Sequence, residues 1–166
     1  MQLKLIEQFL VKGFVNKYNL VLICLFFSNF SLATDLERTQ PDPSLNAREV
    51  VEIVMNALAN NDYPYQNHGI EITYNFASPE NKIITGPLSR FSEMIRLGIY
   101  STMLNSKDIK YENYEVEGGN AQLDVILQTR DNRTQGFQFR LKRQIDNEFH
   151  DCWMTDSVML ISLTTT

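Results

Sequence analysis

The sequence predicts an α+β fold, in which N-terminal helices pack on a strongly curved antiparallel sheet of about four strands. Two observations lead to this prediction. Apolar residues recur at helical spacing as far as Leu104, and from Lys110 onward they alternate with polar residues at a period of two. Turn-forming pairs then divide the second half into short segments. Helices followed by a run of strands is the element order of an α+β domain.

The helical half begins at a capping signal. Asn46 and Glu49 have the spacing of a capping box, in which each side chain binds a free backbone N–H group of the other residue. A second helix is expected over residues 69–76, and residues 77–80 break it. A third helix is expected to begin at Pro87, since proline is tolerated in a first helical turn. The apolar stripe of the first helix comprises Val50, Val51, Ile53, Val54, Ala57 and Leu58.

Three turns divide the strand half, at Gly118–Gly119, Asp131–Asn132 and Asp146–Asn147. The last strand is expected within residues 149–160, a run that holds the only tryptophan, Trp153. Period-two geometry sends alternate side chains of a strand to opposite faces, unless a β-bulge shifts the alternation. The predicted apolar face of the sheet comprises Ala121, Leu123, Val125, Leu127, Phe137, Phe139 and Leu141.

Residues 1–33 have the pattern of a signal peptide. Lysines precede the apolar run of residues 20–27, and small residues end at Ala33, where we expect cleavage. The mature protein would then be exported to a periplasmic, secreted or lumenal location. The alternative is an uncleaved membrane anchor formed by residues 14–33, and the membrane would then be contacted only through this leader.

After the leader, residues 34–45 form a polar linker and residues 46–163 a single domain. The full chain carries 20 acidic against 15 basic residues, and loss of the lysine-rich leader increases this excess. Nucleic-acid binding needs the opposite charge, so nucleic acid is not an expected partner. Cys152 is the one cysteine outside the leader, which excludes a disulfide within the mature chain.

Asp156 is the weak candidate for a catalytic residue. It lies in an otherwise uncharged run, residues 152–161, and desolvation there would raise the pKa of its carboxyl, as a general base or acid needs. The other interpretation is that Asp156 caps or hydrogen-bonds neighbouring backbone. His150 and Cys152 could share a strand face, but the spacing marks no third ligand, so neither a metal nor another cofactor is predicted.

A set of mostly aromatic residues could line a pocket, although aromatic residues at regular spacing also form ordinary core. The basic residues Arg140, Lys142 and Arg143 lie close together on one predicted strand and are interpreted as solvated charges paired with nearby acids. The pocket-lining candidates are Tyr74, Phe76, Phe91, Tyr100, Phe137, Phe139, Trp153 and Thr155.

Three short motifs carry a resemblance to a known family. They are Phe76-Ala77-Ser78-Pro79, then Thr85-Gly86-Pro87-Leu88 with Phe91, then Cys152-Trp153-Met154-Thr155-Asp156-Ser157-Val158. In this order and spacing they resemble a family of unknown function in the nuclear-transport-factor-2-like superfamily, which includes SnoaL-like cyclases and ketosteroid isomerases. The resemblance extends over residues 47–160.

The resemblance implies a cone-shaped fold, with three helices wrapped by a strongly bent sheet, a pocket inside the cone and frequent homodimerisation through the sheet. In the related families the tryptophan of the last strand points into the cone. Trp153 would then form the floor of a mostly apolar cavity closed by Phe91 and Tyr100. Asp156 would serve structure rather than catalysis.

These observations favour a ligand-binding or protein-interaction module that uses the cone pocket or the sheet face, with a small apolar molecule as ligand. The alternative is a cofactor-independent isomerase, cyclase or hydratase. An enzyme of that kind needs a pair of ionisable groups that converge on one cavity. The general base, oxyanion pair and His–Asp pair of the enzymatic members do not align with this sequence, so the binding role is preferred.

Overall fold

The computed structural model describes residues 39–163, which belong to one compact unit. The expected signal peptide and the start of the linker lie outside these residues. No helix in the described range is long and apolar enough to cross a membrane. The elements are α4 (Ala47–Ala59), α5 (His68–Asn75), α6 (Pro79–Thr85), α7 (Leu88–Arg96), the 3₁₀-helix η1 (Gly98–Met103), β1 (Lys107–Glu117), β2 (Asn120–Gln128), β3 (Thr134–Arg143) and β4 (Trp153–Ile161).

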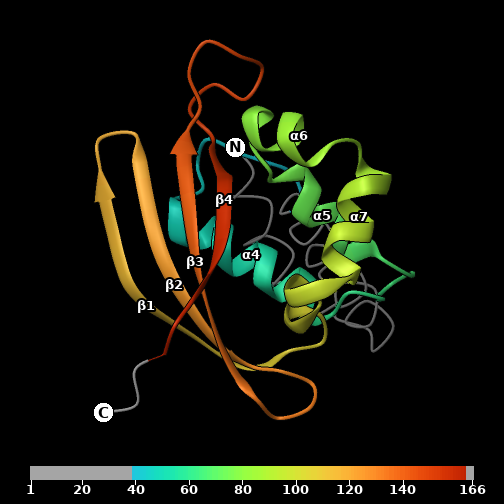
Figure 1. The fold of residues 1–166 in the computed structure, drawn as a ribbon. Helices are drawn as coiled ribbons and strands as arrows, with labels where there is room; N and C mark the ends of the chain where they lie inside the picture. The colour runs from blue at the N-terminus through green and yellow to red at the C-terminus, as the bar shows by residue number, and fades with distance from the viewer. Residues whose placement is uncertain (1–38, 164–166) are drawn as a thin grey trace, which may run out of the picture. The chain divides into compact units, whose positions relative to one another are not determined.

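The strands form one antiparallel sheet in the order β1-β2-β3-β4, so that each strand pairs with its neighbours in sequence. The described helices lie on one face of this sheet (Figure 1). This arrangement confirms the α+β class. The sheet is twisted and open, with β1 and β4 at its edges, and it is neither strongly curled nor closed.

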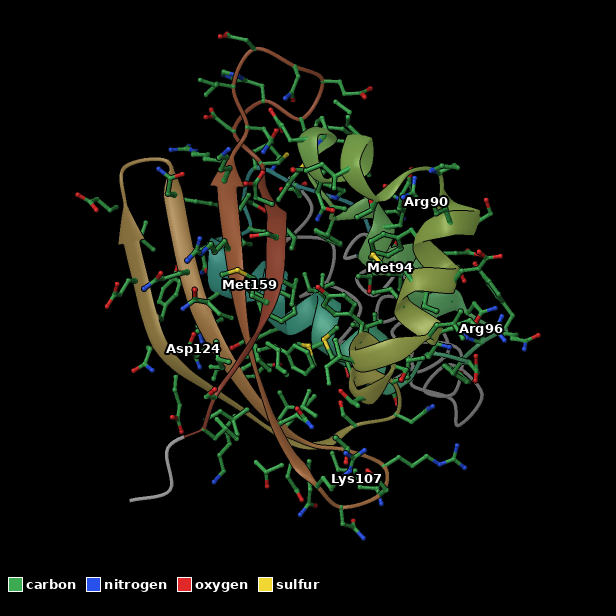
Figure 2. The ribbon with its side chains drawn as sticks, viewed as in Figure 1. Arg90, Met94, Arg96, Lys107, Asp124 and Met159 are labelled. Carbon is green, nitrogen blue, oxygen red and sulfur yellow. The ribbon has the colours of Figure 1, made fainter. Side chains whose placement is uncertain are left out.

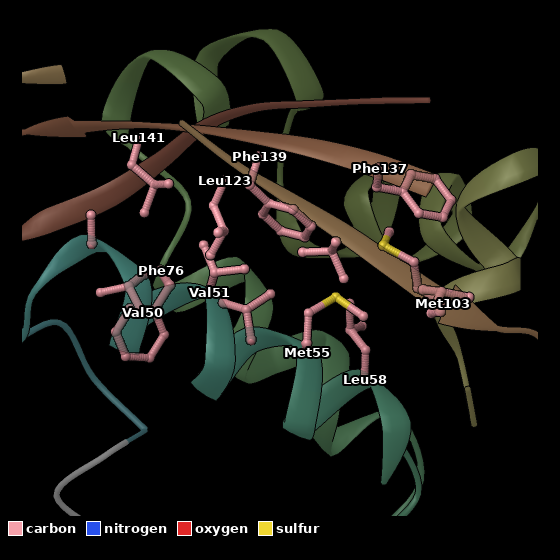
Figure 3. Close-up of a cluster of buried hydrophobic side chains, with 14 of the residues drawn as sticks. Val50, Val51, Met55, Leu58, Phe76, Met103, Leu123, Phe137, Phe139 and Leu141 are labelled. Atoms are coloured by element: carbon pink, nitrogen blue, oxygen red, sulfur yellow. The ribbon is translucent and has the colours of Figure 1, made fainter. Parts of the chain in front are cut away.

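Helix α4 supplies most of the helical side of the core. Its capping box is confirmed, since Asn46 N–H donates to Glu49 Oε2 over 2.8 Å and Glu49 N–H donates to Asn46 Oδ1 over 3.0 Å. Its buried face meets the apolar face of β2 and β3 (Figure 3). The side chains in this contact include Val50, Val51, Met55 and Leu58 of the helix and Leu123, Phe139 and Leu141 of the sheet.

The expected helix over residues 69–76 is confirmed as α5, which packs closely on α4. A Cβ atom on Gly69 would lie 2.0 Å from the carbonyl oxygen of Ala57, so only glycine allows this approach. Asn61 joins the two helices, because its carbonyl accepts from Gly69 N–H over 2.9 Å and its Oδ1 accepts from Ile70 N–H over 3.1 Å.

The sequence interpretation missed α6. The sequence predicts only a helix break at residues 77–80, yet Ser78 caps a new helix by accepting from Asn81 N–H over 3.0 Å, with Pro79 in its first turn. The next helix, α7, begins at Leu88, directly after Pro87. The buried residues of α7 are Phe91 and Ile95.

The last strand begins four residues later than the run of residues 149–160 suggested. It begins at Trp153, because the preceding residues close a loop in which Gln144 N–H donates to Cys152 O and Asp151 N–H donates to Gln144 O, both over 2.9 Å. Asp151 takes a left-handed conformation, φ 65°, that no regular strand contains. The predicted shared strand face for His150 and Cys152 is therefore wrong, since both lie in this loop.

Candidate functional site

A cavity of about 260 Å³ lies between the helices and the β3–β4 half of the sheet. Every helix of the described residues contributes to its wall, together with one side chain of β3 and four of β4. Most of the lining is apolar. The apolar side chains are Val54, Leu58, Ala77, Ile84, Phe91, Met94, Ile95, Tyr100, Met103, Phe139 and Val158.

Helices α6 and α7 form the outer wall. Met94 lies on the side of α7 that faces the sheet, whereas Arg96 extends outward from the same helix (Figure 2). Ile84 of α6 lines the cavity although its exposed fraction is 74%. An exposed residue in the lining marks the place where the cavity meets solvent, so we take the α6 side as its entrance.

Strand β4 reaches the cavity through a β-bulge. Leu141 pairs with Thr155 and Arg140 pairs with Ser157, which leaves Asp156 as the extra residue. A bulge of this kind shifts the alternation of side chains along a strand. Thr155 before the bulge and Val158 after it both face the helices, where Val158 pairs with Phe139 and packs on the core.

The segment between α5 and α6 fixes the bulge from the free edge of β4. Thr155 N–H donates to Phe76 O, and Ser78 N–H donates to Thr155 O, each over 2.8 Å. Asn81 Nδ2 donates to the same Thr155 carbonyl over 3.1 Å. The backbone of Thr155 is thereby saturated. This pairing also prevents a strand of another chain from pairing with the edge of β4 at Thr155.

The carboxylate of Asp156 is held by two partners. The Ser78 hydroxyl donates to Oδ1 over 3.1 Å, and Lys142 Nζ lies 3.4 Å from Oδ2. The side chain of Asp156 is 25% exposed. This surrounding, with a lysine beside the carboxylate, differs from the uncharged one that the sequence indicated. The hydrogen-bonding interpretation of Asp156 therefore fits the geometry, with a side-chain partner in place of the expected backbone.

The side chain of Thr155, unlike that of Asp156, has no polar partner among the described residues. Its side chain is 5% exposed and its hydroxyl oxygen, Oγ1, is buried with no hydrogen-bond partner among the described residues. Buried hydroxyls nearly always have one. Thr155 therefore brings an unsatisfied polar atom to the lining of a mostly apolar cavity.

Of the pocket-lining candidates, the structure brings together Phe91, Tyr100, Phe139 and Thr155, and it adds Asp156 to the same lining. The Tyr100 hydroxyl donates to Val158 O over 3.1 Å, which ties η1 to β4 across one end of the cavity. Whether these residues bind a ligand stays a prediction.

The other four candidates lie outside this lining. Phe76 and Phe137 are fully buried in the core, and Trp153 packs against the core while partly exposed. Tyr74 meets Phe91 edge-on, with ring centroids 5.2 Å apart, and its hydroxyl donates to Gly86 O over 3.3 Å. Tyr74 and Phe137 contact lining residues, Phe91 and Tyr100 respectively, and none of the four side chains lines the cavity itself.

Cys152 is buried in the loop before β4. Burial raises the pKa of its thiol, and the nearby Asp42 and Asp151 carboxylates act in the same direction. A thiol with a raised pKa is a poor nucleophile, which fits a small buried apolar residue. Within residues 39–163, no group of His, Cys, Asp and Glu side chains could hold a metal ion.

The sequence interpretation missed the wall supplied by α6, namely Asn81, Ile84 and Thr85. A signal for it exists in the sequence. Serine followed by proline and glutamate is a typical helix start, with a capping hydroxyl, a proline at the first helical position and an acid in the first turn.

A second hollow, of about 350 Å³, lies on the sheet face opposite the helices. Its lining is largely charged, with Glu115 and Glu117 on one side and Arg140 and Lys142 on the other. Lys142 pairs with Asp156, and Arg143 Nη2 lies 3.2 Å from Asp151 Oδ1. The interpretation of this basic group as charges paired with acids is confirmed for Lys142 and Arg143.

Comparison with known proteins identifies the family. No curated protein and no solved structure matches the chain. The family described as Domain of unknown function (DUF4864) matches residues 41–165, which include every element of the sheet and every helix described above. The chain belongs to this family of domains of unknown function.

Proposed function

We propose that this protein is a binding module that holds a small, mostly apolar molecule in the cavity between its helices and strands β3 and β4. The observation that carries the proposal is the cavity itself. Protein interiors are close-packed, with few voids larger than a water molecule. An apolar void of about 150 Å³ is enough to bind benzene, and this cavity measures about 260 Å³.

The chemistry of the lining favours binding over catalysis. Among the described lining residues, Asp156 and Tyr100 are the ionisable ones. Both are engaged, Asp156 with Ser78 and Lys142 and Tyr100 with the carbonyl of Val158. An isomerase, cyclase or hydratase needs ionisable groups free to exchange protons with a substrate. We therefore keep the enzymatic alternative second.

The proposal extends to fold family, location and assembly. The motifs around Phe76, Pro87 and Trp153 support membership of the nuclear-transport-factor-2-like superfamily, whose fold implies a pocket between helices and sheet. The signal-peptide pattern of residues 1–33 supports export of the module after cleavage near Ala33. Pairing through the sheet face in that superfamily supports a homodimer.

A titration with indane tests the proposal. This bicyclic hydrocarbon of nine carbons is larger than benzene and carries no polar group. Burial of its apolar surface, less the entropy lost on association, predicts a dissociation constant between about 10 µM and 1 mM. Isothermal titration calorimetry of the full chain should show one site. Absence of heat and of ligand-observed NMR contacts at 1 mM protein would contradict the proposal.

A pair of variants locates the site. Val54→Phe adds a ring to the α4 wall of the cavity and should abolish indane binding. Val116→Phe makes the same change on β1, at a side chain that is 49% exposed and outside the lining, and should leave binding unchanged. Circular dichroism of both variants establishes that each is folded before the titration.

A further inference from the structure

We infer that the ligand of this cavity is a neutral amphiphile, an apolar body that carries one hydroxyl or similar hydrogen-bonding group, and that Thr155 Oγ1 binds this polar group. The inference rests on the proposed binding function. It adds the chemical class of the ligand and the orientation in which the ligand lies.

The first argument is the unsatisfied hydroxyl. Two threonines of the sheet region are almost fully buried, Thr129 at 1% exposure and Thr155 at 5%. The Thr129 hydroxyl donates to Asp131 and accepts from Arg133 N–H. The Thr155 hydroxyl has no partner in the described part of the chain. A partner supplied by a ligand would satisfy it.

The second argument is that the backbone groups of Thr155 itself cannot satisfy the hydroxyl. The N–H group of Thr155 is used by Phe76, and its carbonyl oxygen already accepts from Ser78 and Asn81. Threonine hydroxyls often bond to nearby backbone groups instead. Here the hydroxyl stays buried without such a partner, on a residue that belongs to the cavity lining.

The third argument concerns charge. The described lining of the cavity contains one carboxylate, Asp156, and no lysine, arginine or histidine. Lys142, the cation that pairs with Asp156, lines the hollow on the other face of the sheet and not this cavity. An anionic ligand would find no cation in this lining to pair with, because Lys142 already pairs with Asp156 and lies outside it. A neutral polar group needs no such cation.

The experiment compares three ligands with one carbon skeleton: indane, 2-indanol and indane-2-carboxylate. Each is titrated at pH 7 into the full chain, into Thr155→Val and into Asp156→Asn. Valine has nearly the shape of threonine without the hydroxyl, so the fold should be retained. Thr129→Val is the matched control, since it removes a buried hydroxyl that lies outside the cavity lining.

Thr155→Val should weaken the binding of 2-indanol by roughly three- to tenfold, the usual effect of one net hydrogen bond, and leave indane unaffected or bound more tightly. Thr129→Val should leave the ratio of the two affinities at its wild-type value. Asp156→Asn should strengthen the binding of indane-2-carboxylate by about tenfold while 2-indanol changes little.

The outcomes separate this inference from the proposed function. If indane binds and Thr155→Val leaves the 2-indanol-to-indane affinity ratio unchanged, the polar site is wrong although the cavity binds ligand. If the carboxylate binds the wild-type protein more tightly than 2-indanol, the neutral class is wrong. If none of the three ligands binds, both the cavity proposal and this inference fail.

Discussion

The Ser78 hydroxyl donates a hydrogen bond to Asp156 Oδ1 over 3.1 Å and so joins the start of α6 to the β-bulge of β4. The same hydroxyl accepts from Asn81 N–H over 3.0 Å as the N-cap of α6. Ser78 is fully buried. The Ser78 side chain thus connects α6, which forms the cavity entrance, with β4, which brings Thr155 and Asp156 to the cavity lining.

Ser78→Ala should lower the free energy of unfolding by about 1 to 3 kcal/mol, because it removes the N-cap and leaves the Asp156 carboxylate without a donor. Urea unfolding followed by circular dichroism measures the change. Ser89→Ala, at an exposed position of α7, is the control and should stay within about 0.5 kcal/mol of wild type. Equal effects of the two changes would show that the Ser78 contacts do not stabilise the fold.

Thr155→Val and Thr129→Val should have opposite effects on stability. Removal of the unsatisfied Thr155 hydroxyl should stabilise the ligand-free protein by about 1 kcal/mol, since a buried polar atom without a partner is unfavourable. Removal of the Thr129 hydroxyl should destabilise by about 1 to 3 kcal/mol, because it leaves Arg133 N–H unpaired. Thermal unfolding of both variants tests this pair of signs, and a loss of stability in both would contradict the account of Thr155.

Gly69→Ala should be strongly destabilising. The added Cβ would meet the backbone of Ala57 and Asn61 rather than a movable side chain, so α4 and α5 would have to separate. We expect a loss of about 3 kcal/mol or more, at the upper end of the range for overpacked sites. Gly119→Ala, where the nearest atom lies 3.9 Å from the new Cβ, should change the free energy of unfolding by less than about 1 kcal/mol. Similar values for the two variants would argue against close helix packing.

The raised pKa of Tyr111 predicts that the free energy of unfolding falls at alkaline pH. Burial raises the pKa of its phenol to about 12, the Glu52 carboxylate adds to the shift, and Arg48 opposes it. A folded-state pKa above the unfolded value of 10.0 contributes stability that is complete below pH 10 and is lost as pH rises from 10 to 12. Urea unfolding between pH 9 and pH 11.5 should show a shallower decline for Tyr111→Phe than for wild type. Parallel declines would contradict this assignment.

Much of the fold could be predicted because its local signals agree with its tertiary contacts. The capping box at Asn46 and the apolar stripe of α4 specify one helix in one orientation. The strict alternation from Ala121 to Leu127 places one face of β2 in the core. Glycine or Asn/Asp pairs mark the turns, since these residues take the left-handed backbone that Gly118, Asn132 and Asp146 adopt.

Less of the site could be predicted, because it depends on contacts between distant segments. The bulge at Asp156 is fixed by the bridge from residues 76–78, and no local property of β4 specifies that bridge. Alternation does assign Trp153 and Thr155 to the same face. Alternation does not predict that Trp153 packs against the core while Thr155 belongs to the cavity lining.

The most direct test of the central claim is the set of intermolecular NOEs between indane and the methyl groups of the full chain. Binding in the cavity predicts NOEs to Leu58, Ile95 and Met103, which line it from three different helices. Methyl groups of Ile126 and Val116, on β2 and β1 outside the lining, should show none. NOEs confined to exposed apolar side chains such as Ile83 and Leu97, with none to Leu58, Ile95 and Met103, would contradict the account.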